Sequence, residues 1–350
     1  MIPTTPEDVT ADWMTAALQR SGRLGDARVT DIASSPVGVG MLSENIRFTL
    51  GFDGPTDAPA TLVAKFPARD EHSRTTGIRH GIYLNEVRFY QDMAPGMTAR
   101  VPRPYLAEHD AATGDFVLLL EDLAPARVED QVAGCSVEDT EKVIVQAARL
   151  HAFRWNDPAL LNIDWLMSRT RQSARLAEMY PECLATFAER YAGVLDPRDI
   201  EMCRRVGTRL DEFFAIPPDR FTVKHGDLRV DNVLFDVRGG DEAAILDWQT
   251  ACVGCGMSDV AFFIGSGLTK EARRAHEERL VRLYHRHLTD LGVDYPWAAC
   301  WADYRFQACQ SIVTAVIASS RARRSDRGDR VFQTLARRGC AQLRDLDGLA

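Results

Sequence analysis

The stretch of residues 223–249 constrains this chain most, because three side chains with oxygen donors follow one another in it at short intervals. Asp227 is followed by Asn232 five residues later and by Asp247 fifteen residues after that. Two short apolar runs enclose a glycine-rich turn, which is the sequence pattern of a β-hairpin. Such a hairpin would bring the loop that carries Asp227 and Asn232 close to the strand end that precedes Asp247.

These three side chains suit one kind of chemistry. Phosphoryl transfer requires an oxygen that accepts the proton of the attacking hydroxyl, and it requires hard oxygen ligands for Mg²⁺. Asp227 can supply the first, and Asn232 and Asp247 can supply the second. A carboxyl group of ordinary pKa is ionised at neutral pH, so neither aspartate needs special tuning. The structural alternative is a His-Gly-Asp turn with Asn232 as a capping residue, which leaves Asp247 unexplained.

The pattern H-G-D-x-x-x-x-N, followed by I-L-D-W, resembles the catalytic loop and the metal-binding aspartate of the aminoglycoside phosphotransferase and choline-kinase-like family. The resemblance implies that Asp227 is the catalytic base, that Asn232 and Asp247 bind Mg²⁺, and that His225 braces the loop. It also implies a contact between Arg229 and the γ-phosphate, at the place where protein kinases carry a lysine. An arginine on the loop surface is the alternative for Arg229.

Lys65 is a second candidate for contact with nucleotide. The chain has only four lysines against 38 arginines, yet Lys65 interrupts the apolar run 62–66. In the family that this chain resembles, a lysine in this strand holds the α- and β-phosphates of ATP and is oriented by a glutamate from the next helix. The resemblance therefore implies Lys65 as an ATP ligand and Glu86 as its partner. Glu44 and Glu71 are alternatives to Glu86, and a solvent-facing lysine on an alternating strand is the alternative to a phosphate contact.

The first third of the chain predicts a helix followed by a small β-sheet. Helical periodicity covers 5–20 and 79–93, and strand patterns cover 29–36, 45–52, 60–66, 101–108 at a sheet edge, and 115–120 in a fully buried position. The loop between the first two strands contains Gly38, Gly40 and Ser43, which can approach phosphates through backbone and hydroxyl groups. By the resemblance, the peptide groups from Glu121 to Leu123 would bind the adenine edge.

Beyond residue 123 the pattern becomes helical. Ser136 begins a helix whose buried stripe includes His151, which we expect to be a packing residue. Further helical patterns cover 169–180, 196–214, 269–291, 297–319 and 329–344, and the charge run 321–330 predicts a solvated loop. The resemblance adds a supporting role for Asp259, which would brace the backbone of the catalytic loop.

Composition limits the classes of partner and the compartment. The net charge of −8 disfavours nucleic acid and anionic membranes as main partners. Residues 1–20 contain Pro, Glu and Asp in place of an apolar leader, which predicts a cytosolic protein. The eight cysteines include one close pair, Cys252 and Cys255. Because no second ligand pair occurs at a matching spacing, buried thiols are a better expectation than a zinc or redox site.

These features predict an α+β, bilobal fold like that of the protein kinases, with a small β-sheet lobe over residues 1–122 and a larger, mainly helical lobe over residues 123–350. ATP and Mg²⁺ would lie between the lobes, and a small molecule with a hydroxyl group would be the phosphate acceptor. The predicted function is therefore an ATP-dependent small-molecule phosphotransferase. The alternatives are a non-catalytic nucleotide-binding module and, less favoured because H-R-D, D-F-G and A-P-E are missing, a protein kinase.

Overall fold

The computed structural model describes residues 2–38 and 42–350, which form two compact units. Unit 1 comprises Met1–Gly96, Val101–Ala124 and Asp247–Thr250, and unit 2 comprises Met97–Arg100, Pro125–Leu246 and Ala251–Ala350. The short segment Met97–Arg100 is joined to the rest of unit 2 through Arg100, whose carbonyl accepts from the N–H of Ile245 at 3.0 Å. The predicted lobe boundary after residue 122 stays a prediction, because a compact unit does not show where an independently folding domain ends.

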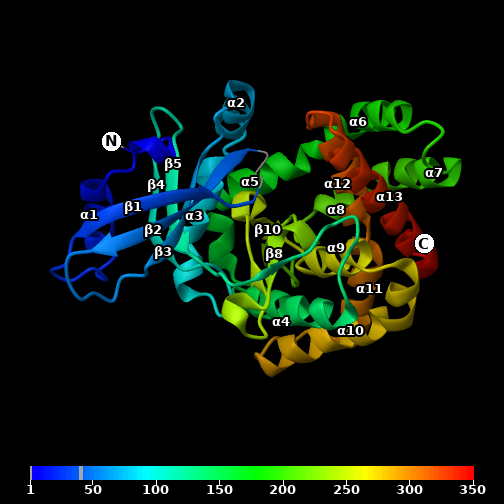
Figure 1. The fold of residues 1–350 in the computed structure, drawn as a ribbon. Helices are drawn as coiled ribbons and strands as arrows, with labels where there is room; N and C mark the ends of the chain where they lie inside the picture. Colours follow the sequence, from blue (N-terminus) through cyan, green and yellow to red (C-terminus); the bar gives the residue numbers. More distant parts are fainter. Residues whose placement is uncertain (1, 39–41) are drawn as a thin grey trace. The chain divides into compact units, whose positions relative to one another are not determined.

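Unit 1 is built on a five-stranded antiparallel sheet with the strand order β1-β2-β3-β5-β4 (Figure 1). The strands are β1 (Val29–Pro36), β2 (Ser43–Phe52), β3 (Thr61–Pro67), β4 (Pro104–His109) and β5 (Phe116–Glu121). They confirm the predicted strands to within three residues at each end, and β4 lies at an edge of the sheet, where a strand containing proline is tolerated. Every residue of β5 is buried, which indicates that both faces of the sheet are covered at this strand.

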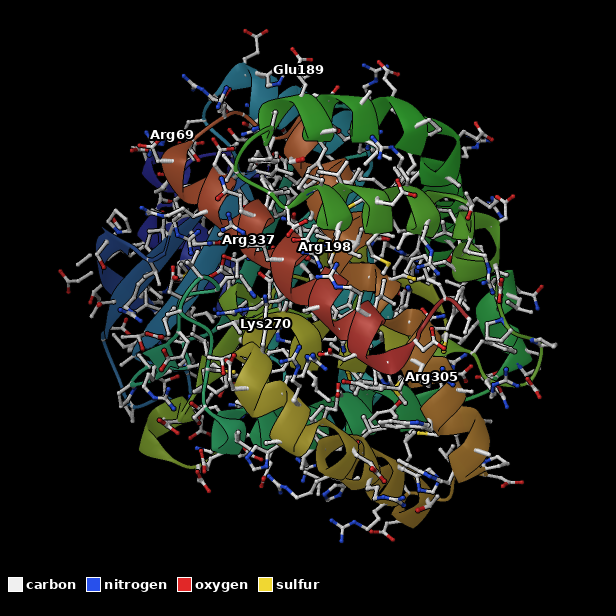
Figure 2. The ribbon with its side chains drawn as sticks, turned by 90° about the vertical axis from the view of Figure 1, so that its right-hand side faces the viewer. Arg69, Glu189, Arg198, Lys270, Arg305 and Arg337 are labelled. Atoms are coloured by element: carbon white, nitrogen blue, oxygen red, sulfur yellow. The ribbon has the colours of Figure 1, made fainter. Side chains whose placement is uncertain are left out.

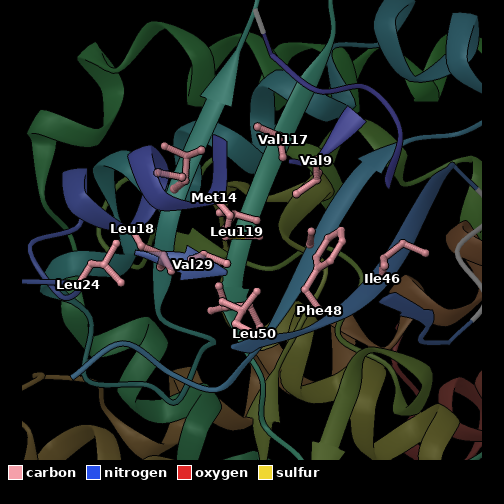
Figure 3. Packing of buried hydrophobic residues seen from close by; sticks show 14 of the residues in the cluster. Val9, Met14, Leu18, Leu24, Val29, Ile46, Phe48, Leu50, Val117 and Leu119 are labelled. Atoms are coloured by element: carbon pink, nitrogen blue, oxygen red, sulfur yellow. The ribbon is translucent and has the colours of Figure 1, made fainter. Parts of the chain in front are cut away.

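One face of the sheet packs on helix α1 (Ala11–Arg20). Thr10 caps this helix, since its hydroxyl accepts from the N–H of Trp13 at 3.1 Å. Met14 and Leu18 of α1 belong to one buried cluster with strand residues such as Phe48 and Leu119 (Figure 3). The residues that β2, β3 and β5 contribute to the cluster alternate along each strand, because successive side chains of a strand point to opposite faces of the sheet.

The opposite face of the sheet carries α3 (Ile82–Asp92), which follows α2 (Glu71–Arg79). Tyr83 of α3 stacks on Phe116 of β5 with ring centroids 4.5 Å apart. The sequence predicted one helix over residues 79–93. In the structure, residue 79 is the last residue of α2, and α3 begins only after Gly81. The reason is the left-handed conformation of Gly81, with φ of 62°, which a continuous helix does not allow.

Unit 2 is mainly helical. Its α-helices are α4 (Val137–Phe153), α5 (Asp164–Ala174), α6 (Leu176–Arg190), α7 (Pro197–Gly207), α8 (Leu210–Phe214), α9 (Met257–Gly267), α10 (Lys270–Asp290), α11 (Trp297–Gln307), α12 (Cys309–Arg321) and α13 (Asp326–Leu346). α9 is buried along its whole length, and the cap interactions predicted for Ser136 and Thr269 are present at the starts of α4 and α10. With the antiparallel sheet of unit 1, this helical unit confirms the predicted α+β class.

Short strands form two further sheets in unit 2. One has the order β6 (Arg127–Val128), β8 (Val233–Phe235) and β9 (Ala244–Ile245), and the other pairs β10 (Cys252–Gly254) with β7 (Thr222–Lys224). The antiparallel pairing of β8 with β9 confirms the predicted hairpin. Because β7 leads directly into residue 225, these small sheets fix both ends of the stretch that carries Asp227 and Asn232.

Two predictions for the last third of the chain are wrong. The residues 297–319, predicted as one helical segment, form two helices, because the helix is interrupted at Ala308 between α11 and α12. The charge run 321–330 is irregular only up to Ser325, whose hydroxyl accepts from the N–H of Gly328 at 3.1 Å and so caps α13. Acidic side chains in the first turn also favour this helix start, since they complement the helix dipole.

The close cysteine pair, Cys252 of β10 and the nearby Cys255, is free and buried. All eight cysteines of the chain are free thiols, and Cys252 and Cys255 lie in the interior of unit 2. Burial raises the pKa of the Cys255 thiol to about 12, which keeps it protonated at neutral pH.

In the described part of the chain, no helix combines the length and the apolar character that crossing a bilayer requires.

Candidate active site

The first group of candidate residues forms an ionic cluster in unit 1. The Lys65 ammonium lies 2.7 Å from a carboxylate oxygen of Glu86 and 3.0 Å from Oδ1 of Asp247. Lys65 and Glu86 are almost completely buried, whereas the side chain of Asp247 keeps 39% of its surface exposed. The structure therefore brings together three of the residues that the sequence singled out. Glu44, the alternative partner for Lys65, instead pairs with Arg69 at 2.7 Å (Arg69 is labelled in Figure 2).

Strand alternation explains why Lys65 reaches Glu86. Leu62, Ala64 and Phe66 of β3 belong to the cluster on the α1 side of the sheet. Lys65 must therefore point to the opposite face, where α3 carries Glu86. A lysine in an apolar strand is thus not solvent-facing here, because its face of the sheet is covered by a helix.

Burial and charge act in opposite directions on this cluster. Burial works against the charged ammonium, but attraction to Asp247 and Glu86 outweighs it and raises the pKa of Lys65. Burial also raises the pKa of Glu86, and attraction to Lys65 only partly offsets it. Asp247 is the more exposed of the two carboxyl groups, so it is the one that an added cation can reach.

The backbone holds Asp247 in place. Asp247 has φ of 63°, a left-handed conformation that aspartate adopts more readily than most residues. The ring of Trp248 lies parallel to that of Phe89 of α3, with centroids 3.8 Å apart. Asn85 of the same helix donates to the carbonyl of Gln249 at 3.0 Å. The segment Asp247–Thr250 is therefore fastened to α3, the helix that also carries Glu86.

The second group of candidate residues lies on the loop after β7 in unit 2. Asn232 donates through Nδ2 to the main-chain oxygen of Asp227 at 2.8 Å and to its Oδ2 at 3.0 Å. These two bonds fix the orientation of the Asn232 amide, so its oxygen Oδ1 is the atom available to a cation. An amide oxygen and carboxylate oxygens are the ligand types that Mg²⁺ prefers, so the donor chemistry of Asn232 and Asp247 fits this metal.

Arg229 lies beside the predicted base. Its Nε donates to Oδ2 of Asp227 at 3.2 Å, and its Nη1 contacts Asp231. Burial opposes its charge, but attraction to these two carboxylates outweighs burial and raises the pKa of Arg229. Only 16% of its side chain is exposed, so the alternative of a loop-surface arginine does not describe it.

Asp259 of α9 holds the backbone of the catalytic loop through hydrogen bonds. It accepts from the main-chain N–H of His225 at 2.6 Å and from that of Gly226 at 2.9 Å. Gly226 has φ of 82°, a conformation that favours glycine and lets both N–H groups face one carboxylate. Burial alone would raise the pKa of Asp259, but the hydrogen bond from His151 and other nearby groups outweigh it and lower that pKa.

His225 and His151 hold structure rather than face solvent. The Nε2 of His225 lies 2.8 Å from the carbonyl of Leu246, and the N–H of Leu246 donates to the carbonyl of Asn232 at 2.9 Å. His151 is buried, with Nδ1 2.7 Å from the hydroxyl of Tyr284. The two contacts with Leu246 tie the loop to the hairpin strand, and the one from His225 is of the bracing kind that the resemblance implied.

The remaining predicted nucleotide contacts lie in unit 1. Gly38 has φ of 69°, Ser43 begins β2, and Gly40 lies outside the described residues. Glu121 ends β5; its main-chain N–H donates to the carbonyl of Arg103 at 2.8 Å, and its carboxylate accepts from the N–H of Arg103 at 3.2 Å. Leu123 is buried.

Sequence reasoning missed several residues that shape the loop. Gln131 accepts from the N–H of Val230 at 2.8 Å, and Gln310 of α12 donates to the carbonyl of Gly226 at 3.3 Å. A glutamine in a loop or on a helix has no periodic signature, so these contacts had no signal in the sequence.

The chain matches the model of the ecdysteroid kinase-like family over residues 38–293. A comparison with curated protein sequences finds no match. Among solved structures, a candidate aminoglycoside phosphotransferase from Ralstonia eutropha JMP134 is 16% identical with a TM-score of 0.52, over 95% of this chain and 98% of that one. An ethanolamine kinase from Plasmodium vivax is 10% identical with a TM-score of 0.53, over 88% and 82%. The GDP and kanamycin complex of APH(2")-IIIa is 13% identical with a TM-score of 0.53, over 88% and 94%.

At these identities the solved structures show a shared fold, while the family match extends over more than half of the chain. The two groups of residues described above, one around Lys65 and one around Asp227, both fall within the matched residues. The chain therefore belongs to the ecdysteroid kinase-like family, within the kinase-like small-molecule phosphotransferases.

Proposed function

We propose that this protein transfers the γ-phosphoryl group of ATP, with Mg²⁺, to a hydroxyl group of a small molecule. The observation that carries the proposal is the buried Lys65 ammonium, held at 3.0 Å or less from both Glu86 and the more exposed Asp247. A buried lysine oriented in this way is suited to phosphate oxygens, and the exposed carboxylate is suited to a divalent cation. Similar structures include a GDP and kanamycin complex and an ethanolamine kinase, so nucleotides and small hydroxyl compounds are the ligands to test.

Each residue has a proposed role. Lys65 binds the α- and β-phosphates, Glu86 orients Lys65, and Asp247 and Asn232 supply oxygen ligands for Mg²⁺. The metal would neutralise the charge of the phosphates during transfer. Glycine backbone at Gly38 and Gly40 and the hydroxyl of Ser43 would approach the phosphates, and the peptide groups from Glu121 to Leu123 would bind the adenine edge.

Asp227 is the proposed proton acceptor. The acceptor's O–H bond breaks as its oxygen bonds to the γ-phosphorus, the bond from that phosphorus to the bridging oxygen breaks, and ADP leaves. The proton passes to Asp227, whose carboxylate is oriented by Asn232 and by Arg229. Arg229 is partly buried and charged, so it can also stabilise negative charge on the transferred group. Because the transition state is loose, positioning supplies most of the rate and the proton moves late.

The test is a screen for ADP release with Mg·ATP and a panel of small hydroxyl compounds, in the wild type and in Asp227→Asn. We expect ADP release that depends on one class of acceptor and falls about 10²- to 10⁴-fold in the variant, as for the loss of a general base. ATP binding should persist in Asp227→Asn. The matched control is Asp241→Asn, in the hairpin turn, where the side chain is 92% exposed. Unchanged ADP release in Asp227→Asn would exclude this residue as the base, and nucleotide binding without turnover of any acceptor would contradict the enzyme.

A further inference from the structure

Tyr284 of α10 ends a chain of hydrogen bonds that leads to the catalytic loop. Helix α10 packs along α4, which carries His151 (Figure 1). The hydroxyl of Tyr284 lies 2.7 Å from Nδ1 of His151, and Nε2 of His151 lies 3.3 Å from Oδ2 of Asp259. Asp259 in turn accepts from the N–H groups of His225 and Gly226, the two residues before the proposed base. The three side chains of this chain of bonds are fully buried.

The surroundings decide where the hydrogens of this chain lie. Burial raises the pKa of Tyr284 well above its ordinary value, so the hydroxyl keeps its hydrogen. Burial works against the charge of Asp259, but the hydrogen bond from His151 and other nearby groups outweigh it and lower its pKa. The carboxylate of Asp259 is therefore ionised at neutral pH and can only accept. Nε2 of His151, which faces this carboxylate, must carry a hydrogen.

The other ring nitrogen of His151 accepts. The hydroxyl of Tyr284 has one hydrogen to donate, and Nδ1 of His151 is the acceptor that the described residues offer it. If Nδ1 were protonated as well, two hydrogens would face each other and the buried hydroxyl would lose its acceptor, which is costly. The favourable state is thus one neutral tautomer, in which Tyr284 donates to Nδ1 and Nε2 donates to Asp259.

Close packing holds the ring of His151 in place. A Cβ atom at residue 256, directly before α9, would lie 2.8 Å from Cγ and 2.9 Å from Nδ1 of His151, so the ring fills the space that Gly256 leaves. The ring of Tyr284 meets it edge-on, with centroids 5.7 Å apart. Thr222 of β7 donates to the main-chain carbonyl of His151 at 2.8 Å. With the ring held in this way, the hydroxyl decides which nitrogen carries the hydrogen.

We propose that Tyr284 is a positioning residue of the catalytic loop, and that its hydroxyl selects the tautomer of His151 that donates to Asp259. Asp259 then holds the backbone from which Asp227 projects. The inference rests on the proposed function for its effect on catalysis, and it adds a residue of α10 to that site. Without the hydroxyl, the other tautomer becomes accessible. That tautomer turns a lone pair of Nε2 toward the carboxylate of Asp259, which loses a donor and holds the loop less firmly.

Nitrogen NMR of the histidine side chains tests the tautomer. We expect the wild type to show His151 with a hydrogen on Nε2 and none on Nδ1, and we expect Tyr284→Phe to lose this single state. The signals are assigned by their disappearance in His151→Phe. The matched control is Tyr304→Phe, which removes another fully buried hydroxyl, one that donates to Glu277 at 3.0 Å, and which should leave these signals unchanged. A hydrogen on Nδ1 in the wild type, or an unchanged spectrum in Tyr284→Phe, would overturn the inference.

Hydrogen exchange measures the loop itself and requires no substrate. The N–H groups of His225 and Gly226 should exchange about 10-fold faster in Tyr284→Phe than in Tyr304→Phe, the size expected when one ordinary hydrogen bond is lost. The control variant accounts for a general loss of stability. Equal exchange in the two variants overturns the inference. Faster exchange, in a protein that releases ADP with no hydroxyl compound, supports the hold on the loop and contradicts the phosphotransferase.

Kinetics connect the tautomer with catalysis. Tyr284→Phe should lower kcat by about 10-fold and leave KM for ATP and for the acceptor unchanged, because it displaces the proton acceptor and removes no binding group. In a His151→Phe background, which keeps a ring and removes both nitrogens, Tyr284→Phe should have no further effect on kcat. An unchanged kcat, or an equal fall in both backgrounds, would show that the hydroxyl does not act through His151. Unfolding temperatures of all variants show that the fold is retained.

Discussion

Asp259 fixes the catalytic loop by its backbone, through a carboxylate that accepts from two consecutive N–H groups. In Asp259→Asn the amide has one oxygen and one NH₂ group, so one of these N–H groups faces a donor. We expect a loss of about 1–3 kcal/mol in the free energy of unfolding, as for a buried polar group left unsatisfied. The measurement is urea unfolding of the variant and of Asp294→Asn, an exposed control. Equal stability of the two variants would show that Asp259 does not hold the loop.

The same carboxylate makes a specific contribution to acid stability. The pKa of Asp259 is lower in the folded protein than its ordinary value of 3.8. A lowered carboxyl pKa contributes stability that is fully present above the unfolded pKa and is lost as pH falls through the folded pKa. We therefore expect the difference in unfolding free energy between wild type and Asp259→Asn to shrink as pH falls below about 4. Unfolding curves between about pH 2.5 and 6 give this difference, and a constant value across that range would contradict the role of its charge.

At the residue scale, spacing and rarity determined which side chains could be found from the sequence. Asp227, Asn232 and Asp247 stood out by their intervals, and Lys65 stood out as one of four lysines in an apolar strand. Gln310 has neither property, because it lies in a helix of mixed composition. Its hydrogen bond to the carbonyl of Gly226 comes from packing, which only the folded structure reveals.

At the scale of elements, the stack between Trp248 and Phe89 joins the segment of Asp247 to α3. Trp248→Leu removes a fully buried ring, so we expect a loss of about 2–4 kcal/mol in stability together with weaker Mg·ATP binding, because Asp247 loses its position. The control is Trp301→Leu, in which a partly exposed ring that stacks on Tyr304 is removed from α11. Calorimetric titration with Mg·ATP should separate the two variants, and equal affinities would show that the stack contributes only stability.

Elements were predictable where alternation and end signals agreed. The strands of unit 1 and the start of α4 at Ser136 followed from local composition. The interruption at Ala308 did not, because alanine favours a continuous helix. The start of α13 inside a charge run was missed because the charges masked the capping serine, Ser325.

At the scale of the whole molecule, the site depends on contacts between distant parts of the chain. Lys65 and Asp247 are 182 residues apart in sequence and 3.0 Å apart in the structure. No local pattern specifies such a pair, so the sequence could place it only through its resemblance to a family. The sheet order of unit 1 likewise inserts β5 between β3 and β4, a pairing that reading the strands in order does not give.

Binding of nucleotide should stabilise the whole protein. A ligand that binds only the folded state, at 100 times its Kd, adds about 2.7 kcal/mol to the free energy of unfolding. We expect Mg·ATP to raise the unfolding temperature of the wild type, and we expect Asp247→Asn to lose the part of this rise that depends on Mg²⁺. Asparagine also tolerates the left-handed backbone of residue 247, so the variant tests charge rather than strain. An equal Mg²⁺-dependent rise in both proteins would contradict the metal assignment.

The scarcity of lysine has a practical consequence. Of the four lysine side chains, Lys65 and Lys224 are buried, and Lys142 is engaged with Asp236 and Asp241 near the surface. Lys270, at the exposed start of α10, is the most accessible side-chain amine of the described residues. Among the lysines, mild acylation of the native protein should therefore modify Lys270 first and leave the amine of Lys65 unmodified, so that a molecule tethered through Lys270 would keep the candidate nucleotide site intact.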